Sequence, residues 1–320
     1  MPWFEDDLIW SNILNAAHDF LPAVFLFAIS AAYFVIWYVV RNIGRSKKDI
    51  GPVDVDGLRE PGQSSIKKID ELSRIIKCCV WQALTIALIL VLGYVSHIYL
   101  SVNILNSAGS WIVGGIGAAI VIYKLVESIK LIRHRRKLRL SYESELTVGR
   151  ALNQLTIDGK YVYHDFPADN FNIDHIVVGP AGIFTVDSIA RSKPANARTR
   201  RKASTVEYDG KMLNFPKEDN FKIIEKAEWQ ASWLSDWISG AIGEPVAARA
   251  IVALPGWFVK RTSADGISVV NPDQFPSLFK HIKPRPLSGD AIARIVKQLR
   301  RKCREAATVS KADDRGKPAL

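Results

Sequence analysis

The stretch FNIDHIVVGPAGIFTVDSIARSK, residues 171–193, contains two runs of Ile, Val and Phe that have the composition of buried β-strands. A Gly-Pro-Ala-Gly sequence at 179–182 separates the two runs, which predicts a β-hairpin. Each run carries one carboxylate, Asp174 and Asp187, at a place where a buried strand is normally apolar. Two carboxylates in adjacent buried strands need a compensating charge, so they are the first candidates for a functional site.

The sequence around this hairpin alternates between helical and extended patterns. Apolar residues at helical spacing predict helices at 142–155, 221–239 and 288–306. Short apolar runs predict strands at 160–166, 247–254 and 266–271, and a second hairpin at 205–215. We therefore expect an α/β (α+β) domain with a central mixed sheet at 141–306, followed by a disordered tail at 307–320.

The first 140 residues have the composition of a membrane anchor. Residues 20–40 contain no charged side chain, and neither do the 46 residues from 78 to 123. The second run is too long for one membrane span and suits two, with a break in the Asn-, Ser- and Gly-rich stretch at 101–110. Because buried core helices seldom need such long uncharged stretches, we predict three transmembrane helices, at about 20–40, 78–100 and 107–130.

The distribution of Lys and Arg predicts the orientation of this anchor. The first 19 residues contain no basic residue, whereas the segment 41–77 contains nine and the segment after residue 123 is dense in Lys and Arg. By the positive-inside rule, the N-terminus lies outside, and the loop 41–77 and the C-terminal domain lie in the cytoplasm. The expected location is a multi-pass protein of a bacterial-type inner membrane, with the lipid bilayer as its partner.

The overall charge points to an anionic partner. The chain of 320 residues has a net charge of +11, and its three cysteines encode no disulfide framework. Six basic residues without an acid lie in the run 191–202, and they are our candidates for phosphate contacts: Arg191, Lys193, Arg198, Arg200, Arg201 and Lys202. A solvated loop, or a contact with anionic lipid headgroups, is the alternative interpretation of this run.

The hairpin sequence IDHIVVGPAGIFTVD, together with the order of elements around it, resembles the nuclease-related domain (NERD) family. That family belongs to the restriction-endonuclease-like group with the PD-(D/E)xK motif, and the resemblance covers roughly residues 141–255. The segment ESELTVGRALNQL at 143–155 resembles the opening helix of the family, which contains a Glu. Gln230, in EWQASWL, lies where the family often has a helical Gln.

The resemblance implies a site for Mg²⁺ and a reaction. In the family's group, two strand acids hold the metal, which activates a water and polarises the scissile phosphate. Asp174 and Asp187 match these acids, and Glu145 and Gln230 are further candidate site residues. The chain departs from the motif two residues after the second acid, where Ile189 stands in place of lysine. Arg191 and Lys193 are candidates for a basic group that has moved along the chain.

This departure leaves two hypotheses for the function. In the first, the domain binds nucleic acid non-specifically and hydrolyses phosphodiester bonds with Mg²⁺. In the second, it is a catalytically inactive interaction module tethered to the membrane. Structural roles remain open for the individual residues as well: Asp174 as a turn cap or ion-pair partner, Glu145 as a solvated carboxylate, and Gln230 as an ordinary surface side chain.

Overall fold

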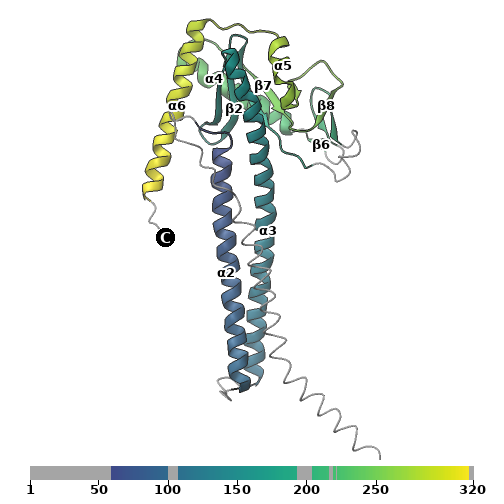
Figure 1. Cartoon of the computed structure of the whole chain (residues 1–320), viewed down its shortest axis with the longest axis vertical. Coiled ribbons are helices and arrows are strands. Elements are labelled where there is room, and N and C mark those ends of the chain that lie inside the picture. The colour runs from purple at the N-terminus through teal and green to yellow at the C-terminus, as the bar shows by residue number, and fades with distance from the viewer. Residues whose placement is uncertain (1–58, 100–106, 193–203, 216–218, 221, 317–320) are drawn as a thin grey trace, which may run out of the picture. The chain divides into compact units, whose positions relative to one another are not determined.

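The computed structural model describes residues 59–99, 107–192, 204–215, 219–220 and 222–316 (Figure 1). The chain divides into two compact units. The first consists of residues 1–50 and 69–136, and the second of residues 51–68 and 137–320. The segment 51–68, which the sequence placed in a cytoplasmic loop of the anchor, therefore groups with the C-terminal domain.

The described part of the first unit, residues 69–99 and 107–136, belongs to two long helices, α2 (Gln63–Tyr99) and α3 (Ser107–Asn153). They run antiparallel, because Ile76 and Val80 of α2 pack against Leu131 and Ile132 of α3. Arg135 Nε donates a hydrogen bond of 2.8 Å to Ser73 Oγ. Near the far end of the pair, a Cβ on Gly117 would lie 2.6 Å from the side chain of Leu90, so this glycine allows the helices to approach closely.

The prediction of three membrane spans has limited support from the structure. Among the described residues, one helical stretch, Gln63–Gly93 of α2, is long and apolar enough to cross a membrane. No second stretch of the described chain meets this test, although the expected span at 107–130 lies within α3. The expected span at about 20–40 lies outside the described residues.

The second unit is built on a five-stranded mixed sheet with the order β1-β2-β3-β7-β9. β1 and β2 pair antiparallel, as do β2 and β3, whereas β3 pairs parallel with β7 and β7 with β9. The strands are Tyr161–Pro167, Asn172–Gly179, Gly182–Ser188, Ala248–Ala253 and Ser268–Val270. The prediction of a mixed α/β domain with a central mixed sheet is thereby confirmed for this part of the chain.

Helices cover both faces of this sheet. On one face, side chains of α4 (Lys222–Ile242) and α6 (Gly289–Gly316) pack on β1, β2 and β3. On the other face lie the end of α3 and α5 (Phe275–His281). Short 3-10 helices occur at Gln154–Asp158 and Pro272–Gln274. Because α6 continues to Gly316, the tail that was expected to be disordered from residue 307 is helical as far as 316.

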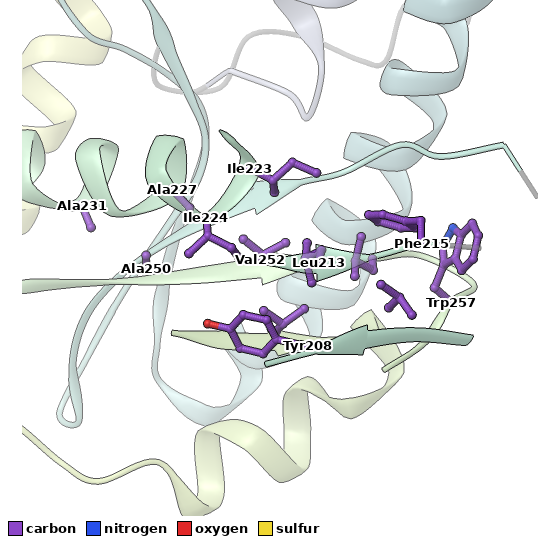
Figure 2. Packing of buried hydrophobic residues seen from close by; sticks show 13 residues of the cluster. Tyr208, Leu213, Phe215, Ile223, Ile224, Ala227, Ala231, Ala250, Val252 and Trp257 are labelled. Carbon is purple, nitrogen blue, oxygen red and sulfur yellow. The ribbon is translucent and has the colours of Figure 1, made fainter. Parts of the chain in front are cut away.

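A second, smaller sheet has the order β6-β5-β4-β8. Its strands are Thr205–Tyr208 (β4), Leu213–Asn214 (β5), Asp219–Asn220 (β6) and Phe258–Arg261 (β8). Figure 2 shows Tyr208 of this sheet, Ile224 and Ala227 of α4 and Val252 of β7 meeting in one hydrophobic cluster. Ile189, which follows β3, packs against the same cluster. Residue 189 therefore lies beside a hydrophobic cluster, which suits its apolar side chain.

Candidate functional site

The two strand carboxylates lie across from each other in the sheet. The register of β2 and β3 pairs His175 with Val186, and Asp174 and Asp187 are one position beyond this pair. Residues that are directly opposite on antiparallel strands direct their side chains to the same face. Asp187 is fully buried at the end of the central strand, with 1% of its surface exposed, and Asp174 is partly buried.

Lysine 226 supplies the positive charge beside these acids. Its Nζ atom lies 2.9 Å from Oδ1 of Asp187, and it comes from the first turns of α4. Burial lowers the pKa of Lys226, but the charges of Asp187 and Asp174 raise it, and the net shift is upward. The ammonium group is therefore held in its charged form next to the acid pair. Position 189 is Ile, but helix α4 places the basic side chain of Lys226 beside the acids.

Asp174 has an unfavourable electrostatic environment. Burial raises its pKa well above the ordinary value of 3.8, and the charges of Asp187 and Glu145 raise it further. Lys226 and the backbone N–H of Ser188, which donates a 2.7 Å hydrogen bond to Oδ2 of Asp174, act in the opposite direction. One ammonium group thus faces three carboxyl groups. Such a site favours either a bound proton or a further cation.

Glu145 is buried on α3, with 8% of its surface exposed, so the solvated role considered from the sequence is wrong. The hydroxyl of Ser65 donates to both of its carboxylate oxygens, at 3.0 and 3.2 Å, and the hydroxyl of Ser141 lies 3.4 Å away. Burial raises the pKa of Glu145, and the charges of Asp165 and Asp187 add to the shift. Glu145 thus belongs electrostatically to the same group of acids.

A fourth carboxylate, Asp165, was not singled out from the sequence. It is the one described non-glycine residue with a positive φ, at 48°, and it is 4% exposed at the end of β1. Its carboxylate accepts hydrogen bonds from Ser64 N (2.9 Å), Ser64 Oγ (2.7 Å) and Asn172 Nδ2 (2.8 Å). Arg59 donates to its backbone carbonyl at 3.2 Å. Asp165 therefore fastens the segment 59–65 to the domain.

A buried hydrogen-bonded chain crosses the sheet next to the acids. It links Asn153 Oδ1, both ring nitrogens of His164, both ring nitrogens of His175, and the hydroxyl of Ser188, with distances of 2.8, 2.8 and 3.0 Å. Burial lowers the pKa of His164 to about 4 and that of His175 well below 6.5. Both imidazoles are therefore neutral at pH 7. Because Asp174 alternates with His175 along β2, the two side chains face opposite sides of the sheet.

Two oxygen atoms of this region are buried without a hydrogen-bond partner. They are Oδ2 of Asp187 and Oε1 of Gln230, and Gln230 lies one helical turn after Lys226 on α4. With 1% of its surface exposed, Gln230 is not the surface side chain considered from the sequence. Unpartnered carboxylate and amide oxygens are the ligand types that Mg²⁺ prefers. The donor chemistry of the site therefore fits this ion.

The ligand types of the site fit a metal ion, but the positions of the described acids do not form a complete metal site. Within the described residues, no group of three or more His, Cys, Asp and Glu side chains is arranged to hold a metal ion. Glu145 directs its oxygens at Ser65 and Ser141, and one oxygen of Asp187 contacts Lys226. Asp174 and Asp187 remain the pair that would hold a divalent ion, with Gln230 as a neutral oxygen ligand.

Most of the basic run after β3 lies outside the described residues, including Lys193, Arg198, Arg200, Arg201 and Lys202. Arg191 is described, and its guanidinium group lies 5.5 Å from the centre of the Phe215 ring. Its backbone carbonyl accepts a hydrogen bond of 3.4 Å from Trp257 Nε1. Arg191 thus contacts the small sheet and its cluster, and the ion pair with Asp187 is made by Lys226.

The family model of NERD, the nuclease-related domain, matches residues 140–255 of the chain. The matched segment includes Glu145, both strand acids, Lys226 and Gln230. It begins within α3 and ends just after β7. No curated protein and no solved structure matches the chain.

Proposed function

We propose that the C-terminal unit is a nuclease that cleaves phosphodiester bonds at the site formed by Asp174, Asp187, Lys226 and Glu145. The observation that carries the proposal is the 2.9 Å ion pair between Lys226 and Asp187. It provides a positive charge beside the acid pair although position 189 is Ile. The match of residues 140–255 to a nuclease-related domain supports the same proposal.

The residues of the site divide the chemistry between them. A divalent ion bound to Asp174 and Asp187 would lower the pKa of an attacking water and polarise the phosphate. The ammonium of Lys226 stabilises negative charge that develops on the phosphoryl oxygens, a role typically worth about 3–4 kcal/mol of the barrier. The unpartnered oxygen of Gln230 would be a further ligand of the ion, or would accept a hydrogen bond from its bound water. Glu145 adds negative charge that favours cation binding.

The substrate in this proposal is nucleic acid held without sequence preference. The basic residues of the run 191–202 follow directly after the strand that carries Asp187. Their charges would contact backbone phosphates, which makes binding weaken steeply as salt concentration rises.

An inactive interaction module is the second candidate function. Two observations favour it: no described group of three acids has metal-binding geometry, and the ammonium of Lys226 already contacts Asp187. In such a module Lys226 would act as a permanent counter-ion for the buried carboxylate. The two candidates differ in what the loss of Lys226 does, because a structural ion pair affects stability and a catalytic one affects turnover.

A cleavage assay with the full chain in detergent tests the proposal. With Mg²⁺ or Mn²⁺ present, we expect cleavage of single- or double-stranded DNA or RNA. Lys226→Gln should reduce the rate about 100-fold or more, since it removes one electrostatic group of the transition state. Lys222→Gln changes an exposed lysine one turn earlier on the same helix and should leave the rate unchanged. No cleavage by the unchanged protein would support the inactive module, and equal rates for the two variants would refute the catalytic role of Lys226.

We further propose that the first unit anchors this domain to a membrane through three spans, with the domain in the cytoplasm. Large apolar side chains on α2 support anchoring: Trp81, Leu88, Ile89 and Leu92 are 51–67% exposed. Such a surface is unfavourable in water and suits a lipid environment. A reporter enzyme fused after Leu320 should be active in the cytoplasm, and one fused before Met1 should be active outside. Activity of the C-terminal fusion on the outer side would refute this orientation.

A further inference from the structure

A cavity of about 580 Å³ lies beside the beginning of β7, whereas the acid pair lies toward the other end of the neighbouring strand β3. Its walls come from α4, β7, the residues before and in β9, and the segment that follows α5. Arg249 of this cavity pairs with Phe184 near the beginning of β3, whereas Asp187 lies at the end of that strand. The separation along β3 is three residues, or roughly 10 Å. The proposed nuclease residues Asp174, Asp187 and Lys226 do not line this cavity.

The charged side chains of this cavity are mainly basic. Arg249, Lys283 and Arg285 line it together with a single carboxylate, Glu228. Within the described part of the chain, none of the three basic residues forms an ion pair, although exposed basic residues elsewhere do, as Arg294 does with Glu244. The cavity therefore carries an excess of positive charge that the surrounding protein does not balance.

Arg249 is held rigidly at this position. Its two terminal nitrogens donate to the carbonyls of Lys283 at 2.6 Å and Ala181 at 2.9 Å, and its guanidinium group lies 4.4 Å from the centre of the Phe184 ring. Its Nε–H is buried and has no acceptor. Burial lowers the pKa of Arg249, and the positive charge of Arg285 lowers it further. The positive charge of Arg249 thus has only neutral hydrogen-bond partners, and a bound anion would balance it and could accept further hydrogen bonds.

We propose that this cavity binds a phosphate group. Guanidinium groups bind phosphate through paired hydrogen bonds, and two of the three basic residues are arginines. The hydroxyl of Ser232, on the α4 wall, adds an exposed donor. The volume lies in the range of small-molecule pockets, about 300–1,000 Å³, and exceeds the need of a lone phosphate. The ligand class is accordingly a phosphorylated small molecule of nucleotide size, and the backbone of a nucleic acid is the other source of the same chemistry.

Phosphate-dependent stabilisation of the full chain in detergent tests this site directly. We expect inorganic phosphate to raise the melting temperature above that in sodium chloride of equal ionic strength. The double variant Lys283→Gln/Arg285→Gln changes two exposed side chains and should weaken the apparent Kd at least about tenfold. Lys280→Gln/Lys297→Gln removes the same charge from exposed positions outside the cavity and should leave the Kd unchanged.

Substitution of Glu228, the single described acid that lines the cavity, should change the phosphate affinity in the opposite direction. Glu228→Gln removes a negative charge from the wall and should strengthen phosphate binding, which a purely structural role of Glu228 would not do. A phosphate effect no larger than that of chloride, or equal Kd values for the two double variants, would overturn the proposal.

Competition then distinguishes the two sources of phosphate. A nucleoside monophosphate that displaces inorganic phosphate identifies a phosphorylated small molecule as the ligand. Displacement by a short oligonucleotide without terminal phosphates, and not by the monophosphate, identifies a nucleic-acid backbone. Both readouts use binding without divalent metal, so they are independent of whether the acid pair cleaves anything.

Discussion

At the scale of single residues, Asp174 is the side chain whose charge is most at odds with its surroundings. Its folded-state pKa is raised above 3.8, so the folded protein binds a proton more tightly at this carboxyl than the unfolded chain does. The free energy of unfolding therefore falls as pH rises above 3.8 through the folded pKa. Removing the charge at neutral pH should stabilise the protein, because a metal-free site then lacks one of its repelling carboxylates.

We accordingly expect Asp174→Asn to raise the melting temperature of the metal-free full chain by a few degrees at pH 7, and by less as pH approaches 4. The amide oxygen of Asn still accepts the Ser188 N–H, so the hydrogen bond is kept. Circular dichroism in detergent measures the effect, with Asp158→Asn, an exposed acid, as the control. A melting temperature at pH 7 equal to or below that of the unchanged protein would contradict this prediction.

The sequence located Asp174 and Asp187 by their context and Glu145 by a family resemblance, and it missed Asp165 and Lys226. Asp174 and Asp187 could be predicted because each interrupts an apolar strand beside a recognisable turn. Lys226 is 39 residues from its partner in the chain, and a lysine on an amphipathic helix looks like an ordinary solvated residue. Which lysine reaches the acids depends on how α4 packs on β3, and that is a property of the tertiary structure.

At the scale of elements, the chain of hydrogen bonds that begins at Asn153 and ends at Ser188 connects the end of α3 with β1, β2 and β3. It passes through the two neutral imidazoles of His164 and His175. The pKa of His164 falls from 6.5 to about 4, so below pH 6.5 the unfolded chain takes up protons that the folded protein does not. The free energy of unfolding consequently decreases as pH falls through this range. The contribution of Asp174 has the opposite sign and is common to any variant that retains that residue.

His164→Gln should therefore show a shallower loss of stability between pH 6.5 and about 4 than the unchanged protein. At pH 7 the variant should also be less stable, by about 1–3 kcal/mol, because buried hydrogen bonds are lost. Denaturation followed by tryptophan fluorescence at several pH values measures both effects. The exposed histidine His281 provides the control, since His281→Gln should keep the slope of the unchanged protein. Identical slopes for all three proteins would show that the buried pair does not titrate as expected.

Most helices and strands could be predicted from the sequence, and the segment that could not be predicted has a physical reason. The two apolar runs of the predicted hairpin within 171–193 form β2 and β3, because their β-branched residues favour strands and the Gly-Pro turn separates them. The place of the polar segment around Pro61 and Gly62 in the C-terminal unit could not be predicted, since this segment has no sustained period. Its order comes from Asp165 and Glu145, acids about 100 and 80 residues away in the chain.

At the scale of the whole molecule, the C-terminal unit is discontinuous in sequence, since it contains residues 51–68 as well as 137–320. Without the first segment, Asp165 loses Arg59 and Ser64, and Glu145 loses Ser65. A fragment of residues 137–320 should therefore be less stable than one in which residues 59–68 are joined to it by a flexible linker. Buried carboxylates that lose their partners cost roughly 3 kcal/mol, or about 6–12 °C in melting temperature.

Thermal denaturation of the two fragments measures this difference. In the joined fragment, Ser64→Ala/Ser65→Ala should remove most of the gain, whereas Lys68→Ala, at an exposed position of the same segment, should retain it. Equal melting temperatures for the fragments with and without residues 59–68 would show that the segment adds no stability.

Because the C-terminal unit is discontinuous in the sequence, its two segments are synthesised at different times. Arg59–Ser65 leaves the ribosome first, and the rest of α2 and then α3 follow. The β1 strand that carries Asp165 emerges only afterwards. Ser64 is thus synthesised 101 residues before Asp165, the acceptor of its hydrogen bonds. Both long helices emerge during that interval, so they can fold or insert into a membrane before the C-terminal domain is complete. A nascent chain arrested before Glu145 would therefore leave the hydroxyls of Ser64 and Ser65 without the carboxylates that accept their hydrogen bonds in the folded unit.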